Sequence, residues 1–379
     1  MKIAIDLTSI PKQMTGVGKY AQSLVKSLAE YDKKNHYWIF IKGNQCKNFN
    51  PNKENFHIIY LSNILHNIPI RILWEQLVLP LYLYREKIDI LHSIHYTTSL
   101  LAPCKCVITF HDMTFYLFPD KHTHVKRAFY RSFIPLSIKK ANRLIAVSEN
   151  TKSDIQKIFN ISLPKIDVIY ETINSIYHIL KDIDTISQIK KKYKIQGKFI
   201  LYVGTLEPRK NIPRLIQAYH RLIIENKIKH QLVIAGKKGW SYQEIFNTFK
   251  SLSCNIKKNV IFTGYVPEEE LPLLYNAANL FVYPSLYEGF GIPPLEAMAC
   301  GVPVIVSNVS SLPEVVGNAG ILVDPYNIEE LCQAIYKIIA KEDLREILKK
   351  EGFQRVREFS RKKLAKKMLE IYEKILKEE

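Results

Sequence analysis

The sequence predicts an α/β protein made of two doubly wound domains, each built on a parallel β-sheet. Short apolar runs rich in Ile and Val recur along the chain, bounded by turn-forming residues. Amphipathic stretches such as residues 18–32 and 211–227 lie between these runs. Strands that alternate with helices form parallel sheets covered on both faces. The runs are about twice as many as the six strands of one doubly wound sheet, so we expect two such domains.

The expected strands fall into two groups of six, separated by a polar, lysine-rich stretch. They are residues 2–6, 36–41, 88–93, 106–110, 143–148 and 165–170, then 198–204, 230–236, 259–264, 279–285, 302–307 and 320–325. We therefore predict an amino-terminal domain over residues 1–180, a linker over 181–197 and a carboxyl-terminal domain over 198–358. Residues 359–379 should form a helix that packs back on the domains. Its apolar stripe is Leu364, Met368, Ile371, Tyr372 and Ile375.

The composition predicts a soluble cytoplasmic protein. The 379 residues are 47% hydrophobic and 24% charged, which is ordinary for a globular chain. The first residues enter a strand without a signal peptide before it, and the most apolar window, residues 74–92, carries too many charges to span a bilayer. The six cysteines are scattered, so neither a zinc framework nor a disulfide scaffold is expected.

The formal net charge of +18 predicts an anionic partner. Residues 121–143 concentrate this charge, because they hold basic and aromatic side chains and no acidic one. Such a segment suits an anionic membrane surface, and the alternative is a solvated helix face. Nucleic acid is not expected, since the chain has neither a recognition-helix motif nor a zinc motif. We therefore expect a protein on the inner face of the cytoplasmic membrane, attached peripherally.

The stretch EGFGIPPLE, residues 288–296, carries two carboxylates on a stiff backbone. Its glycines and prolines exclude a helix interior, so Glu288 should lie on a loop. A short helix over 293–300, stopped by Gly301, should follow and hold Glu296 in its first turn. A helix start can bind phosphate, and Glu296 beside it can accept hydrogen bonds from a ribose diol. The structural alternative is a favourable charge at a helix start.

A second anion site is expected in YVGTLEPRKN, residues 202–211. Arg209 and Lys210 follow a strand and a glycine, and Asn211 should cap the next helix. The carboxyl ends of parallel strands lie along one edge of the sheet, so both sites can address a single diphosphate. We expect Arg209, Lys210 and Glu296 to project into a solvent cleft.

The first half offers two further candidates. Gly16 and Gly18 precede an expected helix, but the strand before them ends near Leu7, too far upstream for a dinucleotide-binding turn. His111 and Asp112 directly follow the strand at 106–110. A histidine at a strand end is otherwise often a hydrogen-bonded structural residue.

Together, E-G-F-G-x-P-x-L-E-A-M-A-C-G-x-P-V-I, GTLEPRKN and TGYVPEEELPLLYNAANLFVYPS resemble the motifs of retaining glycosyltransferases with the GT-B fold. This group 1 family carries an E-x7-E motif. The resemblance is specific over residues 198–324 and weaker in the first half. It implies two Rossmann-like domains that face a central cleft. By this resemblance the catalytic residues are His111, which contacts the transferred sugar, Asp112 and Glu288. The donor-binding residues are Gly16, Gly18, Arg209, Lys210, Tyr265, Val266, Gly289, Phe290, Gly291 and Glu296.

The resemblance also implies the reaction. The chain is similar to bacterial mannosyl- and rhamnosyltransferases, so we expect a hexose, with mannose from GDP-mannose as the favourite, to pass with retention to a lipid-linked or oligosaccharide acceptor. The product would be a surface polysaccharide such as lipopolysaccharide O-antigen. A sugar-nucleotide epimerase or hydrolase on the same scaffold is the alternative.

No segment offers a clear nucleophile, so attack on the face of the departing diphosphate is favoured. No metal and no cofactor are expected. The triplet Asp182–Asp184 resembles the metal-binding D-x-D motif of a different glycosyltransferase architecture, but it falls in the predicted linker and not after a strand. Two positions depart from the family pattern. Thr205 in place of an arginine shifts more of the phosphate binding to Arg209 and Lys210, and residues 171–174 in place of a glycine loop leave residues 170–174 unassigned.

Overall fold

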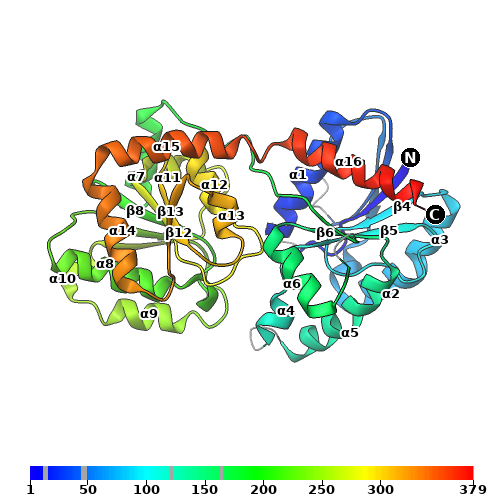
Figure 1. Ribbon diagram of the computed structural model, residues 1–379, viewed down its shortest axis with the longest axis horizontal. Helices are drawn as coiled ribbons and strands as arrows, with labels where there is room; N and C mark the ends of the chain where they lie inside the picture. Colours follow the sequence, from blue (N-terminus) through cyan, green and yellow to red (C-terminus); the bar gives the residue numbers. More distant parts are fainter. Residues whose placement is uncertain (12–15, 44–48, 120–122, 163–164, 379) are drawn as a thin grey trace. The chain divides into compact units, whose positions relative to one another are not determined.

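The computed structural model describes residues 1–11, 16–43, 49–119, 123–162 and 165–378. The chain folds into two compact units (Figure 1). Unit 1 is Met1–Thr172 with Phe359–Glu379, and unit 2 is Ile173–Glu358. Each unit is built on one parallel sheet, so the predicted class of two doubly wound α/β domains is confirmed.

The sheet of unit 1 has seven strands in the order β3-β2-β1-β4-β5-β6-β7. They are β1 Lys2–Asp6, β2 His36–Lys42, β3 Phe56–Leu61, β4 Ile90–Ser93, β5 Lys105–Phe110, β6 Arg143–Ala146 and β7 Ile166–Val168. Six of them are predicted from the sequence, and β3 is not. This edge strand pairs only with β2 and is mostly half-exposed. Ser62 and Asn63 mark its end, but a half-exposed edge strand lacks the buried apolar pattern of the other strands.

Helices cover both faces of this sheet (Figure 1). They are α1 Gly16–Tyr31, α2 Ile68–Leu73, α3 Leu79–Arg85, α4 Thr114–Leu117, α5 His124–Lys140, α6 Glu149–Phe159 and α16 Arg361–Lys377, with a 3-10 turn Asn63–His66 and a π-helical turn Trp74–Val78. On one face, Leu79 and Leu83 of α3 pack with Ala4 and Phe40. Helices α1 and α16 lie together on the other face.

The last helix, α16, is part of unit 1. All five residues of its predicted stripe are buried. The hydroxyl of Tyr372 lies 2.6 Å from Nδ1 of His92 on β4, and Nε2 of His92 lies 2.8 Å from the hydroxyl of Thr109 on β5. Burial, with a smaller contribution from His111, lowers the pKa of His92 to about 3. The last helix, α16, therefore packs on the middle of the sheet of unit 1.

Unit 2 has six parallel strands in the order β10-β9-β8-β11-β12-β13. They are β8 Phe199–Val203, β9 Gln231–Ala235, β10 Val260–Gly264, β11 Leu280–Tyr283, β12 Val304–Ser307 and β13 Gly320–Val323. The helices are α7 Ile183–Lys192, α8 Ile212–Ile224, α9 Gln243–Lys250, α10 Cys254–Lys257, α11 Leu271–Ala277, α12 Ile292–Ala299, α13 Leu312–Val316, α14 Ile328–Ala340 and α15 Glu342–Val356, with a 3-10 turn Pro208–Lys210.

The segment predicted as a linker, residues 181–197, belongs to unit 2 and contains α7. Asp182 begins this helix by accepting a hydrogen bond from the backbone of Thr185, which is a capping role rather than a metal site. Ile189 and Ile195 are buried, and the hydroxyl of Tyr193 donates to Glu270 at 2.7 Å. The many lysines of the segment hide this packing stripe in the sequence.

Each sheet has one point at which the strand order reverses, between β1 and β4 and between β8 and β11. Ligands of open α/β sheets bind at the carboxyl ends of the strands beside such a point. Gly204–Lys210 follow β8, and Glu288 follows β11. The fold therefore brings the two predicted anion-binding segments of unit 2 to the same reversal point.

Two expectations from composition concern membranes and thiols. No helix in the described ranges is both long enough and apolar enough to cross a membrane. The five cysteines that the structure describes form no disulfide, and Cys46 lies outside the described residues.

Candidate active site

The loop after β8 positions the two cations of the predicted anion site. Pro208–Lys210 form the 3-10 turn, and Asn211 in the left-handed conformation joins it to α8. The prediction that the Asn211 side chain caps α8 is wrong. Its amide instead donates to the carbonyl oxygens of Pro284 and Pro325, at 3.0 and 2.8 Å. Because these prolines follow β11 and β13, Asn211 ties the cation loop to the edge of the sheet.

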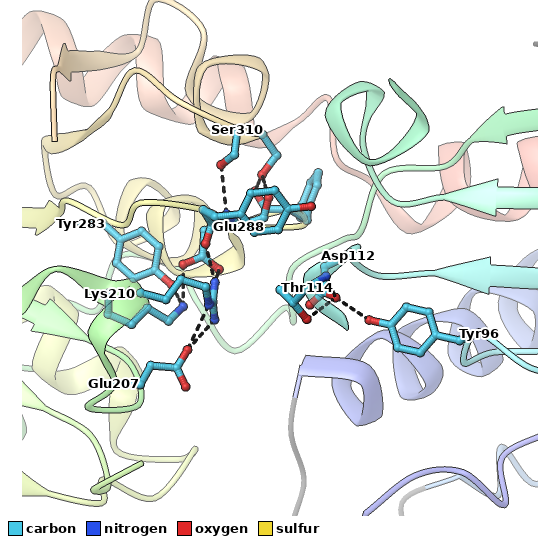
Figure 2. A network of polar contacts seen from close by, with 12 residues as sticks. Tyr96, Asp112, Thr114, Glu207, Lys210, Tyr283, Glu288 and Ser310 are labelled. Atoms are coloured by element: carbon cyan, nitrogen blue, oxygen red, sulfur yellow. Dashed lines mark hydrogen bonds and ion pairs between the residues drawn. The ribbon is translucent and has the colours of Figure 1, made fainter. Parts of the chain in front are cut away.

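Glu288 binds both cations (Figure 2). Its Oε1 accepts a hydrogen bond from Nζ of Lys210 at 2.6 Å, and its Oε2 lies 2.9 Å from Nη1 of Arg209. Lys210 also donates to the hydroxyl of Tyr283 at 2.6 Å, and Arg209 also pairs with Glu207 at 2.7 Å. Two carboxylates and two cations thus form one network, which we call the ion cluster: Glu207, Arg209, Lys210 and Glu288.

Burial and charge act in opposite directions on this cluster. Burial alone would raise the pKa of Glu288, but Arg209 and Lys210 lower it to about 2. Burial and the neighbouring Arg209 lower the pKa of Lys210, against the opposing effect of Glu288. Burial would lower the pKa of Arg209, and Glu288 with Glu207 raises it well above its usual range. Glu288 is therefore a carboxylate throughout the physiological pH range.

The prediction that these side chains project into a solvent cleft is wrong for two of them. Lys210 is 7% exposed and Glu296 is 3% exposed. Each is held by buried partners on neighbouring elements, which sequence patterns do not reveal. Arg209 is partly exposed, with 21% of its side chain accessible.

Three contacts hold the loop that carries Glu288. The backbone N–H of Glu288 donates to Oγ of Ser310 at 2.9 Å, and Oγ of Ser311 donates to the carbonyl oxygens of Glu288 and Phe290 at 3.0 and 2.6 Å. Gly291 has φ +102°, and a Cβ there would lie 2.8 Å from the side chain of Leu312. A residue other than glycine is strained at this position. The loop Gly289–Gly291 is thus fixed between β11 and α12.

Glu296 lies one residue further into its helix than the sequence predicts. Helix α12 begins at Ile292, directly after Gly291, so Glu296 falls in the second turn. Its Oε2 accepts a hydrogen bond from the hydroxyl of Tyr275 on α11 at 3.0 Å. Gly301 stops the helix, as expected, with φ +74°. The carboxylate is therefore placed by α11 as well as by its own helix.

The remaining predicted donor-binding residues of unit 2 lie on two loops. Tyr265 and Val266 follow the edge strand β10, where Tyr265 is 70% exposed and Val266 is buried. Phe290 is buried beside Gly289 in the loop that carries Glu288. An exposed aromatic ring beside a buried valine can stack on a planar base.

In unit 1, His111 is buried at the end of β5, beside the reversal point. Its Nε2 lies 2.9 Å from the carbonyl oxygen of Ile94, which follows β4. A carbonyl oxygen only accepts, so Nε2 carries a proton. The other nitrogen, Nδ1, lies 3.5 Å from Oε1 of Glu171. The ring of Tyr20 contacts the imidazole edge-on at 4.9 Å.

Asp112 is engaged in local structure. Its Oδ1 accepts hydrogen bonds from the hydroxyl of Tyr96 at 2.7 Å and from the hydroxyl and backbone N–H of Thr114 at 2.8 and 3.0 Å (Figure 2). These bonds fix the start of α4, which gives the carboxylate a positioning role beside His111.

Gly16 and Gly18 lie in the first turn of α1, not ahead of the helix. Gly16 is exposed, and a Cβ there would have no neighbour within 4 Å. Gly18 is buried. The residues directly before them, 12–15, lie outside the described residues.

Four site residues escape the sequence argument. Glu207 pairs with Arg209, Tyr283 with Lys210, Tyr275 with Glu296 and Glu171 with His111. Glu207 could have been found, because it stands two residues before Arg209 in the quoted motif. The other three depend on contacts between distant segments, and buried tyrosines look like core residues in a sequence. Within the described ranges, no cluster of His, Cys, Asp and Glu side chains could hold a metal ion.

Comparison with known proteins identifies the class. Residues 184–355 match the family described as Glycosyl transferases group 1, and residues 14–175 match Glycosyltransferase Family 4. The chain is 33% identical over 370 residues to the O-antigen chain mannosyltransferase B of Escherichia coli, covering 95% of this chain and 96% of that protein. It is 31% identical to the O-antigen chain mannosyltransferase RfbU of Salmonella typhimurium, over 64% of this chain and 65% of that protein. The chain belongs to the group 1 glycosyltransferases.

Solved structures show the same fold. A glycosyltransferase from Rickettsia africae superposes with a TM-score of 0.77 at 21% identity, over 100% of this chain and 99% of that chain. Anabaena HepE, solved in complex with UDP and glucose, superposes with a TM-score of 0.75 at 18% identity, over 99% of this chain and 100% of that chain. These likenesses confirm the GT-B fold class, and the matches support neither the epimerase nor the hydrolase alternative.

Proposed function

We propose that this glycosyltransferase moves mannose from GDP-mannose, with retention, to a lipid-linked or oligosaccharide acceptor in the synthesis of a surface polysaccharide. The observation that carries the proposal is the likeness, along almost the whole of both chains, to an O-antigen chain mannosyltransferase. A second relative, over a shorter stretch, carries the same kind of name.

The ion cluster supports a role in binding the donor diphosphate. Arg209 and Lys210 lie at the carboxyl edge of the sheet of unit 2, where Arg209 is partly exposed. In the proposed step, the bond that joins C1 of the sugar to the oxygen of the diphosphate breaks. A bond between C1 and the acceptor oxygen forms on the same face, and the acceptor proton passes to the leaving diphosphate. Positive charge from Arg209 and Lys210 stabilises that leaving group, so no divalent ion is required.

The test of the reaction uses purified protein with GDP-mannose, with and without a lipid-linked or oligosaccharide acceptor. We expect transfer only when acceptor is present, an α-linked product by NMR, and undiminished activity after exhaustive chelation. Donor conversion without acceptor would favour an epimerase or hydrolase. Loss of activity on chelation that magnesium or manganese restores would refute metal independence.

The donor nucleotide is tested separately by thermal shift with GDP, UDP, ADP and dTDP. A ligand present at about 100 times its dissociation constant stabilises the folded state by about 2.7 kcal/mol. We expect GDP to give the largest shift. A larger shift with UDP, the nucleotide bound in the HepE structure, would refute GDP-mannose as the donor while leaving sugar transfer intact.

Helix α5 supports peripheral attachment to an anionic membrane. Its described residues begin after Thr123, which caps the helix, whereas Lys121 and His122 of the predicted segment lie outside the described residues. Val125, Lys126 and Arg131 are exposed on a helix without an acidic residue. We expect binding to anionic vesicles that fades with salt and weakens on charge reversal at Lys126, Arg127 and Arg131. Equal binding to neutral vesicles would refute this electrostatic attachment.

A further inference from the structure

Unit 1 carries a second surface that the electrostatic attachment does not use. Large apolar side chains between Ile64 and Tyr84 lie on the outside of the protein, each between 49% and 77% exposed. We call them the apolar surface: Ile64, Ile68, Leu73, Leu77, Val78, Leu81 and Tyr84. They come from the 3-10 turn and, after the extended residue Asn67, from α2, the π-helical turn and α3, which follow one another directly.

The apolar surface is not needed for the core of unit 1. The same helices already bury Leu65, Leu79 and Leu83, and the last two pack against Ala4 and Phe40 of the sheet. A helix that covers a sheet normally presents polar residues on its opposite side. Here both sides are apolar, which is the pattern of a helix with a second apolar partner.

The charges around the apolar surface indicate what that partner is. Within residues 62–85, all of which the structure describes, the only carboxylate is Glu75. It is 2% exposed and pairs with Arg71 at 2.6 Å. At the end of the segment Arg85 pairs with Glu86 at 3.0 Å, and Lys87 is exposed. An apolar face without an exposed carboxylate, in a unit that also carries the basic helix α5, matches the surface of an anionic bilayer.

One loop, residues 100–102, makes hydrogen bonds both to this segment and to the basic helix α5. Gln76 in the π-helical turn accepts a hydrogen bond from the backbone N–H of Leu100 at 2.8 Å, and Lys140 of α5 donates to the carbonyl oxygen of Ala102 at 2.7 Å. Leu101, between these two contacts, is 63% exposed. The apolar surface and α5 therefore flank one short loop in the same unit.

We propose that the apolar surface inserts among the acyl chains of an anionic phospholipid leaflet, while α5 binds the headgroups beside it. A second copy of the chain is a less suitable partner. A two-fold interface at this surface would gather the exposed cations of both copies, and residues 62–85 offer no exposed carboxylate to pair with them. The inference does not depend on which sugar or nucleotide the enzyme uses.

The experiment compares two triple variants of the full chain. Leu73→Gln, Leu77→Gln and Leu81→Gln change exposed residues of the apolar surface, and glutamine keeps a high helix propensity. Ile183→Gln, Ile224→Gln and Ile347→Gln change equally exposed residues of unit 2 and serve as the control. Both are tested by flotation with vesicles of phosphatidylethanolamine and phosphatidylglycerol, at low salt and at about 0.5 M sodium chloride, where the screening length is only a few ångströms. Circular dichroism and gel filtration accompany each variant.

We expect the wild-type protein and the control to keep part of their vesicle binding at high salt. In the leucine variant this salt-resistant binding should be at least tenfold lower. In a single Leu77→Trp variant, the added tryptophan fluorescence should be quenched by lipids brominated along their acyl chains. Salt-resistant binding that survives the leucine changes would overturn the proposal. So would a wild-type dimer that the leucine changes convert to a monomer, because the surface would then bind a second copy. Complete loss of wild-type binding at high salt would leave only the electrostatic attachment and would also overturn it.

Discussion

Replacing Glu288 by glutamine should destabilise unit 2 by about 3 kcal/mol at neutral pH. Glutamine has the shape of a protonated glutamate, so the variant resembles the protein with Glu288 neutral. Burial raises the pKa of this carboxyl and the two cations lower it, with a net change from 4.5 to about 2. Each pKa unit corresponds to about 1.4 kcal/mol between the two protonation states, so the ionised form is favoured by about 3 kcal/mol.

The pH dependence of this difference has a definite sign. The folded-state pKa lies below the unfolded one, so ionised Glu288 contributes its full stability above pH 4.5. That stability is lost as the pH falls from 4.5 toward about 2, because the folded state must then take up a proton. The gap in unfolding free energy between wild type and Glu288→Gln should therefore be constant near neutrality and shrink below pH 4.5.

The assay must report on unit 2 alone, because two units need not unfold together. Trp38 and Trp74 lie in unit 1 and Trp240 in unit 2. In a Trp38→Phe, Trp74→Phe background, urea unfolding followed by fluorescence reads unit 2 through Trp240. Glu269→Gln, at an exposed glutamate of the same unit, is the matched control and should change stability by less than about 0.5 kcal/mol. A Glu288→Gln variant as stable as wild type, or a stability gap that is the same at all pH values, would refute this account of the ion cluster.

Three further outcomes follow from the geometry. His111→Ala should lower turnover, measured by steady-state rates, while nucleotide affinity, measured by isothermal titration, stays unchanged. Unchanged turnover would reduce His111 to a structural residue. Tyr275→Phe removes a buried hydrogen bond to Glu296 and should cost about 2 kcal/mol in urea unfolding, and an unchanged midpoint would contradict that role. Burial lowers the pKa of His92 to about 3, so unit 1 should lose stability as the pH falls from 6.5 toward 3, by up to about 1.4 kcal/mol per pH unit from this group. The loss should be smaller by that amount in a His92→Gln variant, and equal losses in the two proteins would contradict this role of His92.

The fold follows from the sequence because its strands are buried on both faces. Such strands form continuous apolar runs, and helices with one apolar stripe separate them. The exceptions have physical reasons. Strand β3 is a half-exposed edge strand, and the packing stripe of α7 is hidden among lysines. Residue spacing therefore predicts an element well only when its buried positions are apolar and its exposed positions are polar.

The site is only partly contained in the sequence. The positions of Glu288, Arg209 and Lys210 at strand ends follow from strand and turn signals, because the carboxyl ends of parallel strands share one edge. The pairing of Glu288 with both cations does not follow, since it depends on side-chain directions across 78 residues of chain. For the same reason the sequence does not predict that Oδ1 of Asp112 accepts hydrogen bonds from Tyr96 and Thr114.

The charge balance of the ion cluster bears on how a donor enters. Glu207 and Glu288 oppose Arg209 and Lys210, so the cluster has no net charge. A diphosphate that binds Arg209 and Lys210 as proposed would compete with Glu288 for them, and the low pKa of Glu288 means that protonation near neutral pH does not release the two cations. We expect Glu288→Gln, although less stable, to bind nucleoside diphosphate at least as tightly as wild type, because its cations are no longer neutralised by a carboxylate. Titration calorimetry with the preferred nucleotide measures this directly. Binding that weakens together with stability would mean that Glu288 organises the cations for the donor instead of competing with it.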